Sequence, residues 1–307
     1  MVEKIKKIAI ITDDPGWHGS ELSQSLATHG LGSQYVSLTE CLICTGSEQD
    51  LILPGFEDAL PLGIFVRGIP GGSLEQVIFR LNILHALKDL GICVYNDPRA
   101  IERTVDKPLT SLLLKRAGLP TPATWICETP AQANAILEQE TRANRRLVLK
   151  PLFGSQGLGI YLLESARDLV HDDKFAGVYY LQSYIERPDD AWLDIRVFVI
   201  DGKACSAMLR RGQTWITNRA QGATCEVLPL DNKMRELAEA AVRVLDIDYA
   251  GVDLMPDING ELHIIEVNSV PAWFGLQKVT DFSIATRLID SFVSKIAKNE
   301  ALTTVHP

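Results

Sequence analysis

The sequence lacks any long hydrophobic run, and this absence argues against a membrane-spanning protein. No uninterrupted apolar stretch in the 307 residues approaches the ~20 residues that a helix needs to cross a bilayer. Residues 1–7 lead straight into a short apolar segment and do not have the pattern of a signal peptide. We therefore expect a cytoplasmic protein without a membrane partner.

Basic residues and cysteines are also scarce. The 30 Lys and Arg residues are outnumbered by 39 Asp and Glu, giving a formal net charge of -9. Nucleic-acid binders usually carry a basic surface, so we expect no nucleic-acid partner. Cys41 and Cys44 form one C-x-x-C pair among six cysteines, but a zinc site would need a second ligand pair, and the sequence offers none. We expect reduced thiols with structural roles.

Apolar periodicity predicts a parallel sheet near the N-terminus. Strands are expected at residues 5–12, 64–67 and 93–96, with helices at 19–29 and 74–90 between them. This alternation is typical of an α/β domain with crossover helices. After residue 122 the pattern changes to a strand, a helix at 130–140, a strand at 147–151 and a strand at 159–163. That order indicates an α+β segment.

The dipeptide Asn259-Gly260 predicts a hairpin that carries three oxygen ligands. A two-residue turn there places Asp253 directly opposite Glu266, and Asn268 lies two residues further along the same face. Two carboxylates so close together repel each other unless a cation lies between them. Magnesium accepts oxygen ligands and completes its shell with phosphates. The alternative is a solvated strand face with two unrelated acids.

A glycine-rich loop from Lys150 to Gly159 joins two predicted strands. Its glycines let backbone N–H groups approach an anion closely, which favours a phosphate-covering flap, with an ordinary β-turn as the alternative. It is not a Walker loop, because no Gly-Lys-Ser/Thr follows and the next segment is a strand. Lys150 ends an apolar strand and needs an anionic partner or a route to solvent.

Three further segments are weaker signals alone. Lys107 begins a predicted helix, where an exposed charge is the alternative to a ligand contact. Gln182-Ser183-Tyr184-Ile185 ends a strand whose backbone amides could pair with an adenine edge. Residues 215–222 form a polar loop that could reach the same cavity or simply lie at the surface.

The turn Asp201-Gly202 predicts another hairpin. Asp194 and Arg196 lie two residues apart and share a face, which suits ribose or phosphate contact and charge stabilisation; a surface ion pair is the alternative. Only one of Arg210 and Arg211 can share that face on the partner strand. A two-residue turn favours Arg211, whereas an extra residue favours Arg210.

Taken together, these motifs resemble those of the RimK-type glutamate ligases of the ATP-grasp superfamily, over about residues 96–294. The resemblance implies an α/β plus α+β protein with the ATP-grasp fold. An N-terminal parallel-sheet domain would cover residues 1–100. Two α+β lobes, at residues 101–185 and 186–300, would hold ATP between them.

The resemblance also implies cofactors and residue roles. ATP and Mg²⁺ would be the cofactors, with Mn²⁺ as a substitute. ATP contacts would come from Lys107, Lys150, Gly154, Ser155, Gly157, Gln182, Ser183, Tyr184, Ile185 and Asp194. Magnesium would be held by Asp253, Glu266 and Asn268. Arg196, Arg210 and Asn218 would be the catalytic residues that face the acyl phosphate and the incoming substrate, and here the family pattern prefers Arg210 to Arg211.

The activity implied is ligation of a carboxylic acid to an amine through an acyl phosphate, without a nucleophilic side chain. Ile216 stands where ribosomal-protein modifiers carry arginine, and Ser269-Val270-Pro271-Ala272 replaces their Ala-Ser-Pro-Gly. These departures favour relatives such as the tetrahydromethanopterin and lysine-pathway ligases. We expect L-glutamate to be joined to a small-molecule or cofactor acceptor. The alternatives are ligation to a protein tail, a kinase, and a non-catalytic ATP-binding protein; a homo-oligomer is compatible with all of them.

Arg67 is a candidate for acceptor recognition, because it ends a predicted strand just before Gly68-Ile69-Pro70-Gly71-Gly72. Loops at strand ends are the usual binding positions in α/β sheets. Arg67 would pair with a substrate carboxylate, and Arg80 is a second candidate. The alternative for both is an ion pair at the surface or between domains. His18 is expected in a loop or at the substrate.

Overall fold

The computed structural model describes residues 7–46, 50–154, 157–170, 175–188 and 192–305. The chain divides into two compact units: unit 1 comprises Met1–Ile101, Ile247–Tyr249 and Val270–Pro307, and unit 2 comprises Glu102–Asp246 and Ala250–Ser269. Helix α3 (Pro98–Val105) carries the chain from the first unit into the second. No helix in the described ranges is both long and apolar enough to span a membrane. The finer division at residue 185 stays a prediction.

Unit 1 is built on a parallel sheet with the order β2-β1-β5-β6. Its strands are β1 (Lys7–Ile11), β2 (Gly32–Val36), β5 (Gly63–Val66) and β6 (Cys93–Tyr95). The predicted strands and parallel pairing are confirmed, and β2 is an additional strand. Two short strands, β3 (Leu42–Ile43) and β4 (Leu51–Ile52), pair separately.

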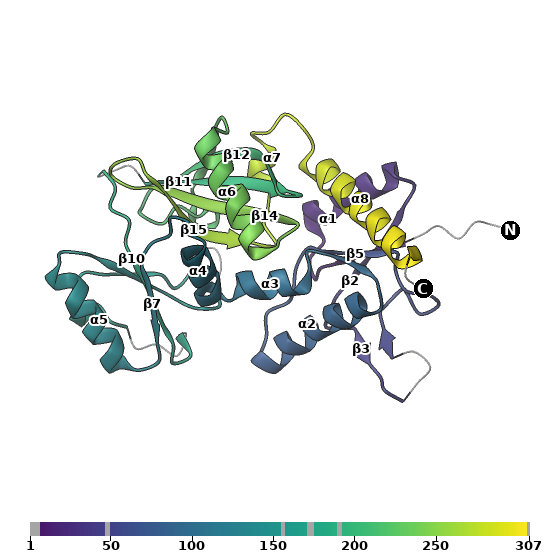
Figure 1. Ribbon diagram of the computed structural model, residues 1–307, viewed down its shortest axis with the longest axis horizontal. Coiled ribbons are helices and arrows are strands. Elements are labelled where there is room, and N and C mark those ends of the chain that lie inside the picture. Colours follow the sequence, from purple (N-terminus) through teal and green to yellow (C-terminus); the bar gives the residue numbers. More distant parts are fainter. Residues whose placement is uncertain (1–6, 47–49, 155–156, 171–174, 189–191, 306–307) are drawn as a thin grey trace. The chain divides into compact units, whose positions relative to one another are not determined.

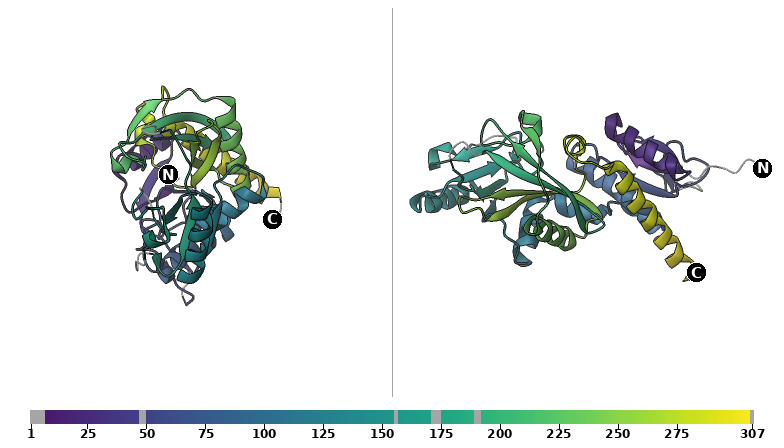
Figure 2. Two further views of the ribbon diagram at one scale, coloured as in Figure 1. Left: turned by 90° about the vertical axis from the view of Figure 1, so that its left-hand side faces the viewer. Right: turned by 90° about the horizontal axis from the view of Figure 1, so that it is seen from above.

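Helices cover both faces of this sheet, which explains why β1 is apolar almost throughout. Helix α2 (Leu74–Asp89) packs Leu84 and Leu87 into the same core as Ala9 and Ile11. On the other face Phe65 contacts Phe292 of helix α8 (Ile284–Val305). Helix α8 lies beside α1 (Gly16–Thr28), as Figure 2 shows. Helix α7 (Phe274–Gln277) completes the unit.

Helix α1 begins at Gly16, earlier than the predicted start at Gly19. The prediction treated the segment before Gly19 as a turn. Pro15 instead adopts helical angles, and its carbonyl accepts a hydrogen bond from the Gly19 N–H at 2.6 Å. Proline suits a helix start because an N–H there would have no partner within the helix. His18 therefore lies on the helix.

Unit 2 contains two antiparallel sheets with packed helices (Figure 1). The first has the order β7-β10-β8-β9, from β7 (Thr124–Cys127), β8 (Leu147–Lys150), β9 (Tyr161–Leu163) and β10 (Tyr179–Ser183). Helix α5 (Pro130–Arg142) packs Ala133 and Leu137 against it. Helix α4 (Lys107–Arg116) and the short η1 (Ala166–Asp168) also belong to this region.

The second sheet has the order β13-β12-β11-β14-β15. Its strands are β11 (Leu193–Ile200), β12 (Lys203–Arg211), β13 (Thr224–Val227), β14 (Tyr249–Pro256) and β15 (Leu262–Asn268). Helix α6 (Asn232–Leu245) packs on this sheet, and η3 (Arg219–Gln221) precedes β13. The two predicted hairpins are β11–β12 and β14–β15.

Candidate active site

A cleft of about 1140 Å³, its open mouth included, is lined by residues of both antiparallel sheets of unit 2. Most of the predicted site residues line it: Lys107, Lys150, Gly154, Gly157, Gln182, Ser183, Tyr184, Ile185, Asp194, Arg210, Asn218, Asp253 and Glu266. Arg196 and Asn268 are not among the lining residues. Ser155 lies outside the described residues. The fold thus brings together residues that are far apart in the sequence.

The strands β14 and β15 place Asp253 opposite Glu266, as predicted. The predicted two-residue turn is wrong, however, because the loop runs from Asp257 to Glu261 with only Gly260 at positive φ. This longer loop shifts the register by one residue, and an irregularity between Asp253 and Leu254 shifts it back. The two effects cancel, so the expected pair forms.

The hairpin β11–β12 resolves the choice between Arg210 and Arg211. Asp201 and Gly202 have φ of 49 and 70 degrees, so the predicted two-residue turn is confirmed. The alternation of side chains along the strands, counted from a two-residue turn, favoured Arg211 on the face of Asp194, and this prediction is wrong. A register shift between Phe198 and Val199 adds one residue to β12 and puts Arg210 opposite Asp194. Arg211 instead forms an exposed pair with Glu226, 2.9 Å apart.

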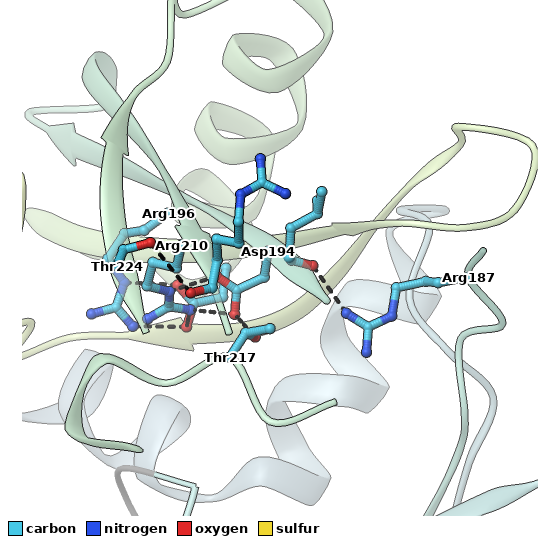
Figure 3. A network of polar contacts seen from close by, with 9 residues as sticks. Arg187, Asp194, Arg196, Arg210, Thr217 and Thr224 are labelled. Atoms are coloured by element: carbon cyan, nitrogen blue, oxygen red, sulfur yellow. Dashed lines mark hydrogen bonds and ion pairs between the residues drawn. The ribbon is translucent and has the colours of Figure 1, made fainter. Parts of the chain in front are cut away.

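Asp194 accepts hydrogen bonds from the buried Arg210, and Asp253 accepts them from the half-buried Arg196. Figure 3 labels Asp194 and these two arginines. Arg210 binds both oxygens of Asp194, and its Nη2 lies 2.9 Å from Asp253. Arg196 donates two hydrogen bonds of 2.7 Å to Asp253, and Thr217 donates to Asp194. Burial acts to raise the pKa of Asp253, but the two guanidinium groups lower it below the usual value. Asp253 is therefore held as a carboxylate.

Two lysines reach the cleft from the first sheet and from α4. Lys150 donates a 2.6 Å hydrogen bond to Gln182 Oε1, and burial lowers the pKa of Lys150 to about 8. Lys107 donates to the carbonyls of Leu152 and Gly154 at 2.8 and 3.0 Å, and burial lowers its pKa as well. Lys107 therefore fastens the described start of the glycine-rich loop to helix α4.

Backbone amides of residues 182–185 were expected to be available to an adenine edge, but two of these N–H groups already have partners within the protein. The N–H of Ser183 donates to Ala123, and the N–H of Tyr184 donates to Arg146, at 2.8 and 2.9 Å. Within the described chain, the N–H of Ile185 has no hydrogen-bond partner. Ile185 thus keeps a backbone donor for a ligand.

Sequence reasoning missed Thr217 and Arg187. Thr217 is buried and binds Asp194. Arg187 donates to the carbonyls of Leu193 and Trp215 at 3.1 and 3.2 Å, and so ties the loop after β12 to strand β11. No pattern distinguished either residue, because both act through contacts that only the folded chain makes.

A family model described as the RimK-like ATP-grasp domain matches residues 104–292, which is more than half of the chain. The chain belongs to the RimK-like ATP-grasp family. It is accordingly an ATP-dependent ligase that forms carbon–nitrogen bonds and releases ADP.

Two relatives of this RimK-like ligase match along almost the whole chain. The tetrahydromethanopterin:alpha-L-glutamate ligase of Methanocaldococcus jannaschii is 31% identical, over 94% of this chain and 99% of that protein. A probable alpha-L-glutamate ligase of Aliivibrio fischeri is 29% identical, over 97% and 98%.

Solved structures confirm the predicted ATP-grasp fold. The ATP-grasp ligase PsnB complexed with minimal precursor superposes with a TM-score of 0.73 at 20% identity, over 95% of this chain and 100% of that one. The RimK domain protein ATP-grasp from Sphaerobacter thermophilus has a TM-score of 0.69 at 17% identity, over 94% and 99%. ATP and Mg²⁺ are the general cofactors of this fold.

Two of the three residues predicted to hold magnesium keep polar side-chain atoms for a hard cation, whereas both oxygens of Asp253 accept hydrogen bonds from Arg196 and the second also lies 2.9 Å from Arg210. Glu266 forms no side-chain hydrogen bond or ion pair with any residue that the structure describes. Asn268 has a buried amide nitrogen without a partner there, and because amide nitrogen and oxygen exchange on a flip, this position can present an oxygen. No group of three or more His, Cys, Asp and Glu side chains that could hold a metal occurs in the described ranges. Phosphate oxygens and water would complete the shell.

Proposed function

We propose that this RimK-like ligase joins L-glutamate to a small-molecule acceptor of the tetrahydromethanopterin type through an acyl phosphate. The observation that carries the proposal is the unpaired carboxylate of Glu266, which shares one cleft with Lys107 and Lys150. A carboxylate and two ammonium groups around one space suit a magnesium nucleotide. The similarity to the tetrahydromethanopterin:alpha-L-glutamate ligase of Methanocaldococcus jannaschii over nearly the whole chain supports the substrates.

The chain's own residues supply binding and charge neutralisation. Lys107 and Lys150 would contact the ATP phosphates, and the Ile185 N–H would donate to the adenine edge. Magnesium, when bound by Asp253, Glu266 and Asn268, neutralises the phosphate charge as a Lewis acid.

The arginines and Asn218 would act on the acyl-transfer side of the cleft. Arg210 is fixed by its two carboxylate partners, so its guanidinium needs no reorganisation when charge develops on the acyl phosphate. Arg196 is bound to Asp253 and would orient that carboxylate. Asn218 lines the cleft close to Gly157, where an added Cβ would lie 2.6 Å from the Asn218 oxygen. The absence of a side chain at Gly157 thus lets the two loops approach each other.

Product analysis tests the proposal. The purified chain, with ATP, Mg²⁺ and L-glutamate, is expected to release ADP only when a suitable acceptor is added, and candidate pterin cofactors with a terminal carboxylate are screened first. Mass spectrometry should find the acceptor heavier by one glutamyl residue. A phosphorylated acceptor without an amide would indicate a kinase, and unchanged ATP with every acceptor would refute the proposed ligation.

Replacing Lys150 with alanine should raise the apparent KM for ATP about 10- to 100-fold, since a hydrogen bond to a charged group contributes roughly 1.5–3 kcal/mol. Lys115→Ala, in which an exposed lysine of α4 is removed, is the matched control and should leave this KM unchanged.

Lys150→Ala is also expected to change the pH dependence of the KM for ATP. The pKa of Lys150 is lowered to about 8, so its charge is present at neutral pH and is lost as pH rises through that value. The wild-type KM for ATP should therefore increase above about pH 8, and Lys150→Ala should lose this dependence. A KM for ATP that is the same in Lys150→Ala and wild type would leave Lys150 with a structural role only.

A further inference from the structure

Unit 1 contains a second group of side chains suited to ligand binding, at the carboxyl ends of its parallel strands. In the order β2-β1-β5-β6, the chain passes from β1 to β2 on one side and continues through β5 and β6 on the other. Ligands of open parallel sheets bind at such a reversal, outside the carboxyl ends of the strands. Arg67 is the first residue after β5 and lies at this position.

The backbone around Arg67 is firmly held. The N–H groups of Arg67 and Gly68 both donate to the carbonyl of Ile11, the last residue of β1, at 2.9 and 3.0 Å. Arg80 on α2 is buried and donates to the carbonyls of Pro70 and Gly71, each at 2.8 Å. These contacts account for Arg80 without a ligand, and they fix the loop that follows Arg67.

The side chain of Arg67, in contrast, lacks polar partners. It forms no side-chain hydrogen bond or ion pair with any residue in the part of the chain that the structure describes, and its Nε is buried. A buried guanidinium donor without an acceptor is unfavourable, because it has given up its hydrogen bond to water and gained none within the protein. Such a group is most simply explained by a ligand that supplies the acceptor.

An aromatic group holds the guanidinium in place. The Arg67 Cζ lies 5.2 Å from the ring centroid of Trp273, within the range of a cation–π contact. Trp273 is oriented in turn by His18, whose Nε2 accepts a 3.2 Å hydrogen bond from the Trp273 backbone N–H. Trp17 meets Phe274 edge to face, with centroids 5.0 Å apart. Arg67 therefore lies against a platform that leaves it few alternative positions.

The charges near Arg67 indicate the kind of anion. Burial lowers the pKa of Arg67, while Tyr249 and Asp14 act to raise it. Asp14 is exposed and forms no ion pair with Arg67 in the described structure. Tyr249 donates its hydroxyl proton to the Val66 carbonyl and is not an acceptor for the guanidinium. Arg67 is thus a single cation near one acidic side chain, Asp14. This charge balance suits a monoanionic ligand, because a phosphate dianion would be left with an uncompensated negative charge.

We propose that Arg67 binds the carboxylate of a substrate through its planar fork, over Trp273. The identity of that substrate rests on the proposed function, and it is either the L-glutamate that is added or the acid group of the acceptor. A guanidinium binds a carboxylate by two parallel hydrogen bonds, which the lone ammonium of a lysine cannot reproduce. If the ligand is the amino acid, Asp14, whose charge acts on Arg67, would accept hydrogen bonds from its ammonium group.

Calorimetric titration of the full chain, with Mg²⁺ and a non-hydrolysable ATP analogue present, tests this site. The probes are L-glutamate, glutarate and the neutral glutaramide. At least one of the two acids should bind and glutaramide should not. Arg67→Gln is expected to weaken acid binding at least about tenfold, and Arg67→Lys by a smaller factor of about five. Arg287→Gln is the matched control, because Arg287 also lies over a ring, Phe282 at 3.3 Å, but is exposed.

Each outcome is informative. Tighter binding of L-glutamate than glutarate identifies the added amino acid as the ligand, and the reverse order identifies the acceptor acid; both support the site. Unchanged acid binding in Arg67→Lys and Arg67→Gln would overturn it, as would equal binding of glutaramide or no binding of either acid to the wild type. Failure of the proposed ligation would look different, because ADP release would be absent while the acid affinity of Arg67 remained.

Discussion

Replacing Glu266 with alanine should reduce ADP formation on the order of 1000-fold while the protein stays folded. A metal ion contributes several kcal/mol to stabilising phosphoryl transfer, and each ~1.4 kcal/mol corresponds to a factor of ten in rate. Because the Glu266 side chain has no hydrogen-bond or ion-pair partner among the described residues, its removal breaks no hydrogen bond or ion pair there. The measurement compares ADP production at saturating ATP and matched Mg²⁺, together with the thermal unfolding midpoint.

A second readout does not require the acceptor. Mg²⁺ should tighten binding of a non-hydrolysable ATP analogue to the wild type, and this increase should be lost in Glu266→Ala. Glu261→Ala is the control: Glu261 lies just before β15, and among the described residues its side chain pairs with the exposed Lys233. Asp253→Asn should also abolish turnover, but it additionally weakens the contacts with Arg196 and Arg210. Wild-type ADP production by either site variant would refute the metal site.

Replacing Arg210 with methionine should lower the free energy of unfolding of unit 2 by about 3–5 kcal/mol, since it leaves the buried Asp194 without a cationic partner and leaves Asp253 with Arg196 alone. Arg211→Met should cost less than about 1 kcal/mol, because its pair with Glu226 is exposed. Urea unfolding of the two variants and the wild type measures the difference. Adjacent residues of one strand are thus compared under identical conditions.

Activity provides an independent check on Arg210. If it faces the acyl phosphate, Arg210→Met should also lose turnover at a temperature where the variant is folded, whereas Arg211→Met should not. Equal stabilities of the two variants would contradict the buried network that places Arg210 beside Asp194.

The predicted elements of the parallel sheet were largely correct, because buried strands and apolar residues at helical spacing leave local patterns. The strands at β1, β5 and β6 and the helix α2 follow from apolar runs bounded by polar turns. The start of α1 was misplaced because Pro15 can begin either a turn or a helix, and only its hydrogen bond to Gly19 decides between them. Strand β2 was missed, since its residues are mostly half-buried and carry no continuous apolar run.

The sequence alone determined which residue types would gather at the site. Two opposed carboxylates repel each other unless a cation lies between them, and a lysine at the end of an apolar strand needs an anionic partner or a route to solvent, so both features indicate a site for a cation and an anion. Tertiary structure decided the register. One inserted residue reverses every side chain of a strand, and the irregularities in β12 and β14–β15 put Arg210 opposite Asp194 and restored Asp253 opposite Glu266. The tertiary structure also decided which polar groups are left without a hydrogen-bond partner. Arg187 donates to the carbonyl of Leu193, and the N–H of Ser183 donates to the carbonyl of Ala123. Such hydrogen bonds depend on how the folded chain packs, and the local sequence does not predict them.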